Sequence, residues 1–579
     1  MVRRRTVKGP REGGSCQTEI KRSSALGQLK RPAGDLATTC GDLGRGQPMR
    51  TFRTVLEQKI WERRLTLEEF VEYAEVFARE YKEPGTLGVR HLQRLIAGRK
   101  PSGERLGPIK PVTARLLERI FDTSVDELLA EPRRATTEGE VPVRARRERA
   151  DSDLAVALDW LDGRAGWSPG TSRRKVNGRL AELDEGKLLD RSVRRGGVSR
   201  TKLARALVDY YGSGLAGYAP YRIRCGGREI ATSVLTRADW LDLAEPLFSG
   251  DRLAFTDRQS EARPSLDEVG AAAAVSRLAE SAALGVRITN SPLYRLLDVN
   301  VGPAIEGTVG LVPFVEYALT MDLLEGELVD AVVGGAEVRP GSLPLRDKYM
   351  SDLASVLDMP SRVCAGGVLA LCAIARPSDP FRGGRDYALL AQERSGHVLN
   401  AARRLAVIPK GFHEPLTDLR ADAQLGATLR REMEEELFGR EDIDSTAAGD
   451  RAAVPMHPSR MSEPMRWLME KPGRLRVECT GFGLNLISGN YEFASLIIID
   501  DDEFWAQYGG DIEANWETAG LRLYSSLDGE LISDLVSQEN WSNEGLFAFL
   551  QGLRRLSEVG DERVKLPSID VMSATASGR

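Results

Sequence analysis

Three glutamates late in the chain have the types and the spacing that metal-assisted chemistry uses. Residues 422–438 are predicted to form an amphipathic helix, on which Glu432, Glu435 and Glu436 are spaced i, i+3 and i+4 and share one face. Like charges at this spacing repel one another. A hard divalent cation such as Mg²⁺ or Mn²⁺ would neutralise them, because it takes carboxylate oxygens as ligands. A solvated acidic helix face is the simpler alternative.

A series of predicted strands surrounds this helix and would have to position it. Residues 363–375 form a long apolar run that suits a buried strand. Further strands are predicted at 387–395, 404–411, 475–480, 492–500 and 521–524. Two helices are predicted to complete this part of the chain, at 528–537 and 542–557.

Strands, a Pro-x-Gly loop and a helix carrying Arg-Glu-apolar-x-Glu-Glu are together similar to the Nudix hydrolase family. Residues 431–436 match the second half of the family's sequence box residue for residue. The resemblance implies an α/β/α fold with a mixed sheet over residues 361–558. It also implies that Glu432, Glu435 and Glu436 bind Mg²⁺ or Mn²⁺. In that family the cations polarise a diphosphate for attack by water, which makes Glu435 and Glu436 catalytic as well.

The first half of the box departs from the family's pattern. The positions of its glycine and glutamate fall on Thr417 and Ala423. An insertion in the loop would let Gly411 and Glu414 stand in for them, and Glu414 would then supply the missing carboxylate at the substrate. By the same resemblance, Arg431 is an ion-pair partner rather than a catalyst.

Residues outside the box complete the predicted site. Arg394, at the polar end of a predicted strand, is a candidate for substrate binding. The family's general base or fourth metal ligand lies outside the box, and Glu492 is the first candidate for it. Asp500, Asp501 and Asp502 are the alternatives. Each of these four carboxylates is equally well explained as a charge at the end of a strand.

A helical pattern runs through residues 51–129, near the start of the chain. A helix is predicted from about 66 to 81, and a short one at 87–97 ends before a glycine. A proline-containing loop then leads to a helix at 111–121 and to a Ser-Val-Asp-Glu-Leu-Leu run. This layout resembles the Cro/repressor-type helix-turn-helix family, whose recognition helix lies in the major groove of DNA.

The resemblance implies that the helix at 87–97 contacts DNA. Carried over by position, the residues that face bases or phosphates are Arg90, His91, Gln93 and Arg94. Arg and Gln are side chains that recognise guanine and adenine edges. Leu92 and Leu95 are expected to pack inward. The segment at 77–85 is longer than the usual turn, and a small helical bundle used for protein contact is the alternative.

Composition limits the remaining classes of function. The chain has 579 residues and a net charge of −5, so any binding to DNA must be a local property. The six cysteines are scattered and form no CxxC pair, which indicates neither a disulfide framework nor a zinc site and fits a reducing cytoplasm. No apolar run approaches the ~20 residues of a membrane span, so no membrane partner is expected.

The sequence predicts a multidomain protein with an all-α domain followed by two α/β regions. The segments are a disordered extension (1–48), a helix-turn-helix-like domain (49–130), a charged linker (131–152), an α/β connecting or regulatory domain (153–345), a Nudix-like domain (361–558) and a tail (559–579). Whether the natural start is Met1 or Met49 stays open.

The favoured function is that of a DNA-binding transcriptional regulator in the cytoplasm. Its Nudix-like domain would bind, or bind and hydrolyse, a nucleoside-diphosphate-type ligand. The alternative is a Mg²⁺-dependent Nudix hydrolase whose N-terminal helices serve assembly. The sequence names neither the ligand nor the operator, and it leaves the oligomeric state open, with a homodimer as one option.

Overall fold

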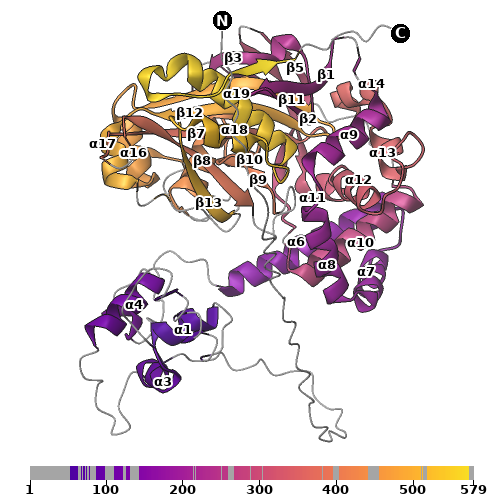
Figure 1. The fold of residues 1–579 in the computed structure, drawn as a ribbon. Coiled ribbons are helices and arrows are strands. Elements are labelled where there is room, and N and C mark those ends of the chain that lie inside the picture. The colour runs from indigo at the N-terminus through magenta and orange to yellow at the C-terminus, as the bar shows by residue number, and fades with distance from the viewer. Residues whose placement is uncertain are drawn as a thin grey trace, which may run out of the picture. The chain divides into compact units, whose positions relative to one another are not determined.

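A computed structural model divides the protein into two compact units, Met1–Glu140 and Val141–Arg579 (Figure 1). In the first unit the structure describes residues 53–62, 67, 70, 71, 74, 77, 78, 87–97, 110–121 and 125–130. In the second unit it describes residues 143–572 except 213, 216, 249–250, 258–265, 287, 303, 381–382, 395–402, 441–455, 510–511 and 513–517. The predicted disordered extension at 1–48 lies outside these residues.

The described part of the first unit contains helices and no strand. The helices are α1 (Val55–Glu62), α3 (Val89–Ala97), α4 (Pro111–Phe121) and α5 (Val125–Leu128). Their apolar side chains share a core, in which Phe70 stacks on Phe121 with ring centroids 5.4 Å apart. The predicted helices at 87–97 and 111–121 are confirmed. Most of the predicted helix from 66 to 81, and of the long segment at 77–85, falls on positions that the structure does not describe.

A mixed sheet organises the second unit. Eleven of the described strands belong to it, and its main path runs β13-β8-β7-β12-β11-β2-β1-β14, with β10 beside β7, β3 beside β11 and β9 beside β8. Strands β7 and β12 pair in parallel, and the other pairs are antiparallel. The strands are β1 (Ala219–Cys225), β2 (Arg228–Thr236), β3 (Leu241–Pro246), β7 (Gly366–Arg376), β8 (Asp386–Arg394), β9 (Leu405–Ala406), β10 (Lys410–Phe412), β11 (Leu475–Asn485), β12 (Tyr491–Ile499), β13 (Thr518–Ser525) and β14 (Ile569–Val571).

Helices cover both faces of this sheet. The helices that precede β7 in the chain are α6 (Val143–Arg164), α7 (Thr171–Glu182), α8 (Glu185–Gly196), α9 (Arg200–Tyr211), α10 (Glu268–Leu284), α11 (Phe314–Ala318), α12 (Leu323–Val333), α13 (Pro344–Tyr349) and α14 (Leu353–Leu357). The later ones are α15 (Leu425–Glu432), α16 (Glu463–Glu470), α17 (Asp502–Tyr508), α18 (Gly529–Val536) and α19 (Asn543–Val559). A second, three-stranded sheet consists of β4 (Arg252–Phe255), β5 (Pro292–Val301) and β6 (Ile305–Pro313).

The two faces of the sheet carry separate apolar clusters. Along β12, Phe493 and Ile497 belong to the cluster that includes residues of α15, whereas Leu496 and Ile498 belong to the cluster that includes residues of α18 and α19. Every residue of β7 is buried. A strand covered on both faces needs apolar residues at every position, which explains why the run at 363–375 is recognisable in the sequence.

The structure differs from the predicted organisation in three places. Strands from the predicted connecting region and from the predicted Nudix-like region lie in one sheet, where β2 pairs with β11, so no separate core divides them near 345–361. Helix α6 begins at Val143, so part of the predicted linker is helical, as its Arg- and Ala-rich composition favours. In the predicted tail, β14 pairs with β1.

The sequence contains no apolar run long enough for a membrane span. No helix among the described residues is both long and apolar enough to cross a membrane.

Candidate functional site

The predicted carboxylate helix is α15, which continues as a π-helical turn over Met433–Leu437. Every fourth residue of this stretch is apolar and buried in the core: Leu425, Leu429, Met433 and Leu437. This pattern holds the helix against the sheet and places its glutamates on the other sides of the helix. The amphipathic helix is confirmed, although its last turn is wider than an α-helical turn. We call Glu432, Glu434, Glu435 and Glu436 the acidic turn.

A carboxylate from a distant segment holds the start of α15. The N–H groups of Leu425 and Gly426 donate to the two carboxylate oxygens of Asp251, at 3.0 and 3.3 Å. A Cβ on Gly426 would lie 2.2 Å from the carbonyl oxygen of Leu247, so glycine is needed for this approach. Burial raises the pKa of Asp251 to about 6, although the two backbone N–H groups lower it. The site therefore depends on a segment outside the predicted Nudix-like region.

Arg431 joins the acidic turn to the preceding loop. Its guanidinium is 2% exposed and pairs with Glu432 at 2.7 Å and with Glu414 at 3.3 Å. It also donates to the carbonyl oxygens of Phe412 and Glu414. Burial alone would lower the pKa of Arg431, but Glu414 and Glu432 raise it overall, so the side chain stays charged. Arg431 is thus an ion-pair partner, as expected, and it brings Glu414 to the acidic turn.

Gly411 lies directly under one of these carboxylates. A Cβ at this position would be 2.0 Å from the carboxylate carbon of Glu432. Strand β10, which contains Gly411, pairs with the start of β7 through Gly411 and Val368. Only a residue without a side chain lets the sheet and Glu432 approach this closely. The Pro-x-Gly loop of the sequence therefore has a steric role in the site.

The other glutamates of the acidic turn have different partners. The N–H of Lys410 donates to Oε2 of Glu436 at 2.6 Å. Glu434 is fully buried, and it accepts the N–H of Ser462 at 3.0 Å and pairs with Arg440 at 3.6 Å. Glu435 is half-buried and is the least buried of the four. Glu432, Glu434 and Glu436 thus have different partners.

Lys410 also connects the acidic turn to a second group of buried polar residues. Its Nζ pairs with Glu544, at the start of α19, at 2.6 Å, and Asn485 donates to the other oxygen of Glu544 at 3.3 Å. Glu492 lies beside them on β12 and is buried. We call Lys410, Asn485, Glu492, Glu544 and Glu325 the Lys410 cluster. The structure therefore places Glu492 near the acidic turn, with Lys410 between them.

Burial changes the protonation of this cluster. It raises the pKa of Glu492 to about 8, and the charge of Glu544 raises it further, whereas Lys410 lowers it. Burial likewise raises the pKa of Glu325 to about 7. For Glu544 the pairing with Lys410 outweighs burial and lowers the pKa. Near neutral pH, Glu544 is ionised and paired with Lys410, while Glu492 retains its proton in a large fraction of molecules.

The alternatives to Glu492 lie at the opposite end of β12. Asp500 accepts a hydrogen bond from Tyr387 at 3.3 Å. Asp501 caps α17 and pairs with Arg474, and Asp502 pairs with Arg385. Structural partners account for these three aspartates.

The remaining predicted substrate-binding residue is Arg394. It is buried at the end of β8, where its backbone N–H donates to the carbonyl oxygen of Arg404. At this end, β8 pairs with β9 on one side and with β13 on the other. Its position is therefore set by the sheet rather than by a flexible loop.

The acidic turn does not have the arrangement of a metal site formed by the protein alone. Among the residues that the structure describes, no group of three or more His, Cys, Asp or Glu side chains could hold a metal ion. The contacts give the reason, since these glutamates accept from arginines or backbone N–H groups. Mg²⁺ that is carried by a phosphate ligand needs only one or two protein carboxylates. Binding of Mg²⁺ or Mn²⁺ at the acidic turn stays a prediction.

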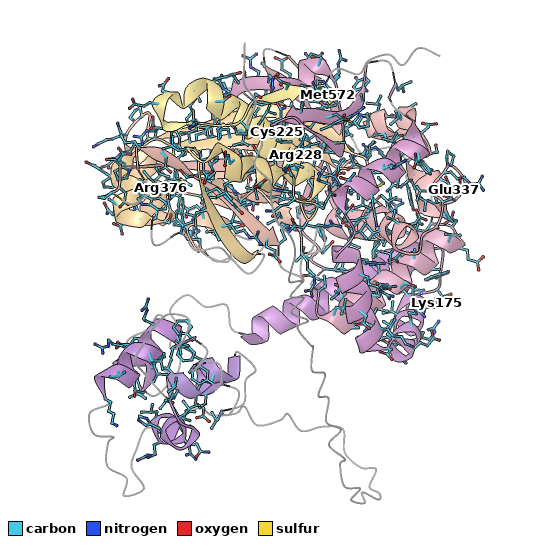
Figure 2. All side chains as sticks on the ribbon, viewed as in Figure 1. Lys175, Cys225, Arg228, Glu337, Arg376 and Met572 are labelled. Atoms are coloured by element: carbon cyan, nitrogen blue, oxygen red, sulfur yellow. The ribbon has the colours of Figure 1, made fainter. Side chains whose placement is uncertain are left out.

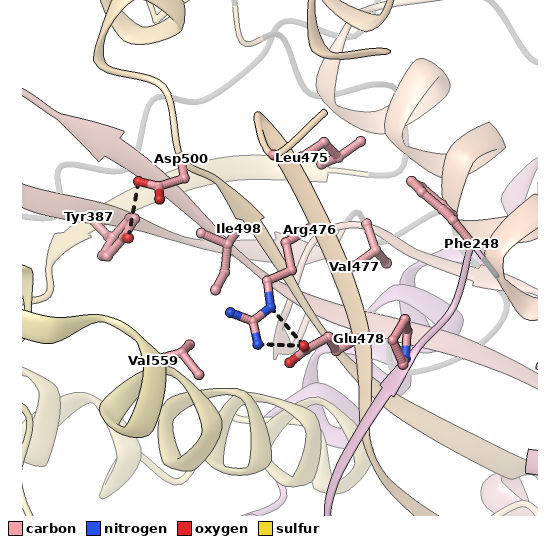
Figure 3. A pocket seen from close by; sticks show the side chains of 11 residues that line it. Phe248, Tyr387, Leu475, Arg476, Val477, Glu478, Ile498, Asp500 and Val559 are labelled. Atoms are coloured by element: carbon pink, nitrogen blue, oxygen red, sulfur yellow. Dashed lines mark hydrogen bonds and ion pairs between the residues drawn. The ribbon is translucent and has the colours of Figure 1, made fainter. Parts of the chain in front are cut away.

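An open cavity of about 430 Å³ lies elsewhere in the second unit (Figure 3). Its lining includes Arg476, Glu478, Asp500 and Tyr387. Arg476 pairs with Glu478, and Tyr387 bonds with Asp500, so the polar lining is satisfied internally. Of the predicted site residues, only the alternative Asp500 contributes to it. The cavity is separate from the acidic turn.

In the first unit, the predicted DNA-contacting residues lie on α3. Leu92 and Leu95 are buried, as predicted, whereas Gln93 and Arg94 are exposed. The apolar side chains join the helical core. Helix α3 therefore has one face in the core and an accessible polar face.

Two further residues of α3 complete this set. His91 is half-buried, and its pKa is lowered by burial and then by the charges of Arg94 and Lys110. His91 is therefore neutral at physiological pH. Arg90 is also in α3, but its side chain is outside the described part of the chain. Arg94 is the positive charge that the described surface of α3 presents.

Some residues of the site were not predicted. Lys410 lies inside the Pro-Lys-Gly loop that the sequence identifies, but its side-chain partner Glu544 is far away along the chain. Glu544 in the first turn of a helix resembles an ordinary helix-start residue. Asp251 precedes a short strand and has no local motif. Of these residues, Asn485 has the clearest sequence signal, because it is a polar residue at the end of an otherwise apolar stretch of β11.

Comparisons with known proteins do not supply a family. No protein-family model matches this chain, and a search of curated proteins finds no similar one. The resemblances to the Nudix and helix-turn-helix families rest on the residues described above. The function must accordingly be argued from contacts and charges.

Proposed function

We propose that this protein is a DNA-binding regulator whose second unit binds a nucleoside-diphosphate-type ligand at the acidic turn without hydrolysing it. The observation that carries this proposal is the set of fixed partners of the acidic turn. Glu432 is held by Arg431, and Glu436 is held by the N–H of Lys410. Hydrolysis by a Nudix-type mechanism would require these same carboxylates on metal ions.

The charges favour a ligand that carries its own cation. A bare diphosphate would be repelled by four glutamates, whereas a Mg²⁺–diphosphate complex needs one or two carboxylates and leaves phosphate oxygens for other donors. Glu435, the least buried member of the acidic turn, is the residue we assign to that contact. The backbone N–H of Lys410 donates to Glu436 of the same turn, while the Lys410 ammonium pairs with Glu544.

The DNA-binding part of the proposal is assigned to α3. It is supported by the exposed Gln93 and Arg94 beside the buried Leu92 and Leu95. A helix with one apolar face in a small core and a polar face with Arg and Gln suits insertion into a major groove. A homodimer stays a prediction.

Ligand binding is tested with full-length protein and a panel of ADP, UDP-glucose and ADP-ribose. Calorimetry with and without MgCl₂ measures binding, and an assay for released phosphate or nucleoside monophosphate measures turnover. We expect a compound of this panel to bind in a Mg²⁺-dependent manner and not to be turned over. Glu435→Gln should weaken this binding. Glu337→Gln is the control, since Glu337 is exposed and far along the chain from this site. Absence of binding to any compound would reject the proposed ligand class.

DNA binding is tested by fluorescence anisotropy with a labelled duplex at low salt. We expect Arg94→Ala to weaken binding and the bound nucleotide to change the affinity. Protein that binds no DNA, with or without nucleotide, would reject the regulator.

One observation favours a hydrolase as the second candidate. Glu492 has a pKa of about 8 and lies next to Lys410, so it can exchange a proton near neutral pH. Turnover in the assay above, abolished in both Glu435→Gln and Glu436→Gln, would favour this enzyme over the non-hydrolysing regulator.

A further inference from the structure

Helix α7 packs against α10 and α6 but leaves most of its residues exposed. Of its 12 residues, only Ser172 and Val176 are buried. A helix usually buries a broad apolar stripe against its own domain. The narrow contact of α7 leaves most of the helix free for another partner.

The first turns of α7 carry three consecutive cations. Arg173, Arg174 and Lys175 are all exposed, and no acidic residue is present in the first turn. Figure 2 shows Lys175 on this outlying part of the second unit. Cations at a helix N-terminus oppose the helix dipole, so this sequence is unfavourable for the helix itself. Local rules of this kind are most often broken where a residue serves a function.

The start of α7 is stabilised in another way. The N–H groups of Gly170 and Ser172 donate to the carboxylate of Asp162, at 2.6 and 2.7 Å. These hydrogen bonds outweigh burial and lower the pKa of Asp162. The helix start is therefore already capped, and the three cations are not needed to hold it.

The cations of α7 differ from those on the neighbouring helices. Arg191 and Arg195 of α8 pair with Glu280 and Asp330, and Arg200 of α9 pairs with Glu539. Among the described residues, by contrast, no carboxylate forms an ion pair with the three cations of α7. Lys175 lies 5.0 Å from the ring centroid of Trp167, and Arg174 donates to Thr171. Their charges remain available at the surface.

We propose that the exposed face of α7 binds the phosphate backbone of duplex DNA, as a second contact that adds to α3. This inference rests on the proposed DNA-binding function. The next turn of this face carries Asn177, Gly178 and Ala181, whose short side chains allow close approach to a phosphate backbone. Phosphate contacts by Lys and Arg provide affinity without sequence preference. The partner fits by charge, since α7 carries four basic and one acidic side chain in a chain of net charge −5.

The test uses full-length protein and a labelled 30-base-pair duplex of mixed sequence, titrated at several salt concentrations. The variant is R173Q/R174Q/K175Q, and R173E/R174E/K175E is the stronger form. The control is R224Q/K471Q/K565Q, which removes three exposed cations elsewhere in the same unit. Far-UV circular dichroism and a melting curve verify that each variant is folded.

We expect the α7 variants to bind DNA roughly tenfold more weakly, with the slope of log K against log salt reduced by about 2–3. The control should retain the wild-type slope to within about 1. If the control and the α7 variants lose DNA affinity equally, the loss reflects only the change in net charge, and the inference is overturned.

The outcomes separate this inference from the proposed function. If Arg94→Ala weakens binding while the α7 variants bind like wild type, the inference is overturned and the role of α3 stands. If the α7 variants weaken binding and Arg94→Ala does not, α7 is a DNA contact and the assignment of α3 fails. Wild-type protein that binds no DNA at low salt overturns both.

Discussion

The acidic turn and helix α7 both concentrate charge of one sign, but they manage it in opposite ways. In the acidic turn, Glu432, Glu434 and Glu436 are buried and each has an arginine or a backbone N–H as partner. On α7, Arg173 and its two neighbours are exposed and form no ion pair with the described carboxylates. Buried charges must be paired to be tolerated, whereas exposed charges are screened by water and salt.

The difference indicates what each region can do. Charges that are fixed by partners define a rigid geometry, and any ligand there must fit around contacts that already exist. Exposed charges make only weak contacts within the protein, so a partner can use them with little effect on the fold. We therefore expect substitutions in the two regions to differ in sign as well as in size.

The largest effect is expected from Arg431→Met. It leaves Glu432 and Glu414 near each other without their cation, and loss of one member of a buried pair destabilises a protein by ~3–5 kcal/mol. Urea denaturation of the full chain measures the change. Arg339→Met, at an exposed pair with Glu337, is the control and should change the free energy of unfolding by less than about 0.5 kcal/mol. A small effect for Arg431→Met would mean that the acidic turn is not held by pairing.

A pH-dependent effect is expected from Glu492→Gln. The pKa of Glu492 is raised from about 4.5 to about 8, so its contribution to stability is complete below the lower value and is lost as pH rises through the higher one. Between pH 5 and 8 the wild type should therefore lose up to about 1.4 kcal/mol per pH unit more than the variant does. Denaturation at a series of pH values tests this, with Glu337→Gln as the control. Parallel curves for wild type and Glu492→Gln would contradict it.

A steric effect is expected from Gly411→Ala. The new Cβ would be 2.0 Å from the carboxylate carbon of Glu432, and overpacking of this kind destabilises by ~1–3 kcal/mol. Gly384→Ala is the matched control, because its Cβ would meet only Leu527 at 3.8 Å. Thermal denaturation compares the two. Equal melting temperatures would show that β10 can move away from the acidic turn at no measurable expense in stability.

The smallest effect, of opposite sign, is expected from R173Q/R174Q/K175Q. Removing cations from the start of α7 relieves their interaction with the helix dipole and should stabilise the unit by a few tenths of a kcal/mol to ~1 kcal/mol at low salt. Denaturation in low and high salt measures the gain, which should shrink as salt is added. Destabilisation would mean that these side chains support the fold and are not free for a partner.

The sequence predicts the strands that correspond to β7, β8, β11, β12 and β13 and the helices that correspond to α15, α18 and α19. It does not predict β3, β14, the three-stranded sheet or several helices, including α7, α8 and α16. Strand β7 is recognisable because it is apolar from Gly366 to Ala375. The pairing of β2 with β11 is not predictable in this way, because it joins residues far apart in the chain and depends on a shared core. This is why the predicted boundary near 345–361 has no counterpart in the sheet.

Only part of the candidate site can be predicted from the sequence. The Arg-Glu-x-x-Glu-Glu pattern identifies the helix and Arg431, because their spacing is local, whereas Glu414 is inferred only from an assumed insertion in the preceding loop. The pattern does not reveal that the last turn is π-helical, nor that Glu436 accepts from Lys410, since both depend on how β10 lies against α15. The partnership of Lys410 with Glu544 requires a third element, α19, and has no sequence signal.

The position of β1 has a consequence for how the chain is made. Strand β1 lies between β2 and β14, and β14 is synthesised long after β1. At ~5–20 residues per second, this edge of the sheet waits on the order of tens of seconds for its neighbour. An open edge strand invites pairing with another nascent chain, and charged side chains along it discourage that. Arg222 and Arg224, both exposed on β1, are charged side chains of this kind.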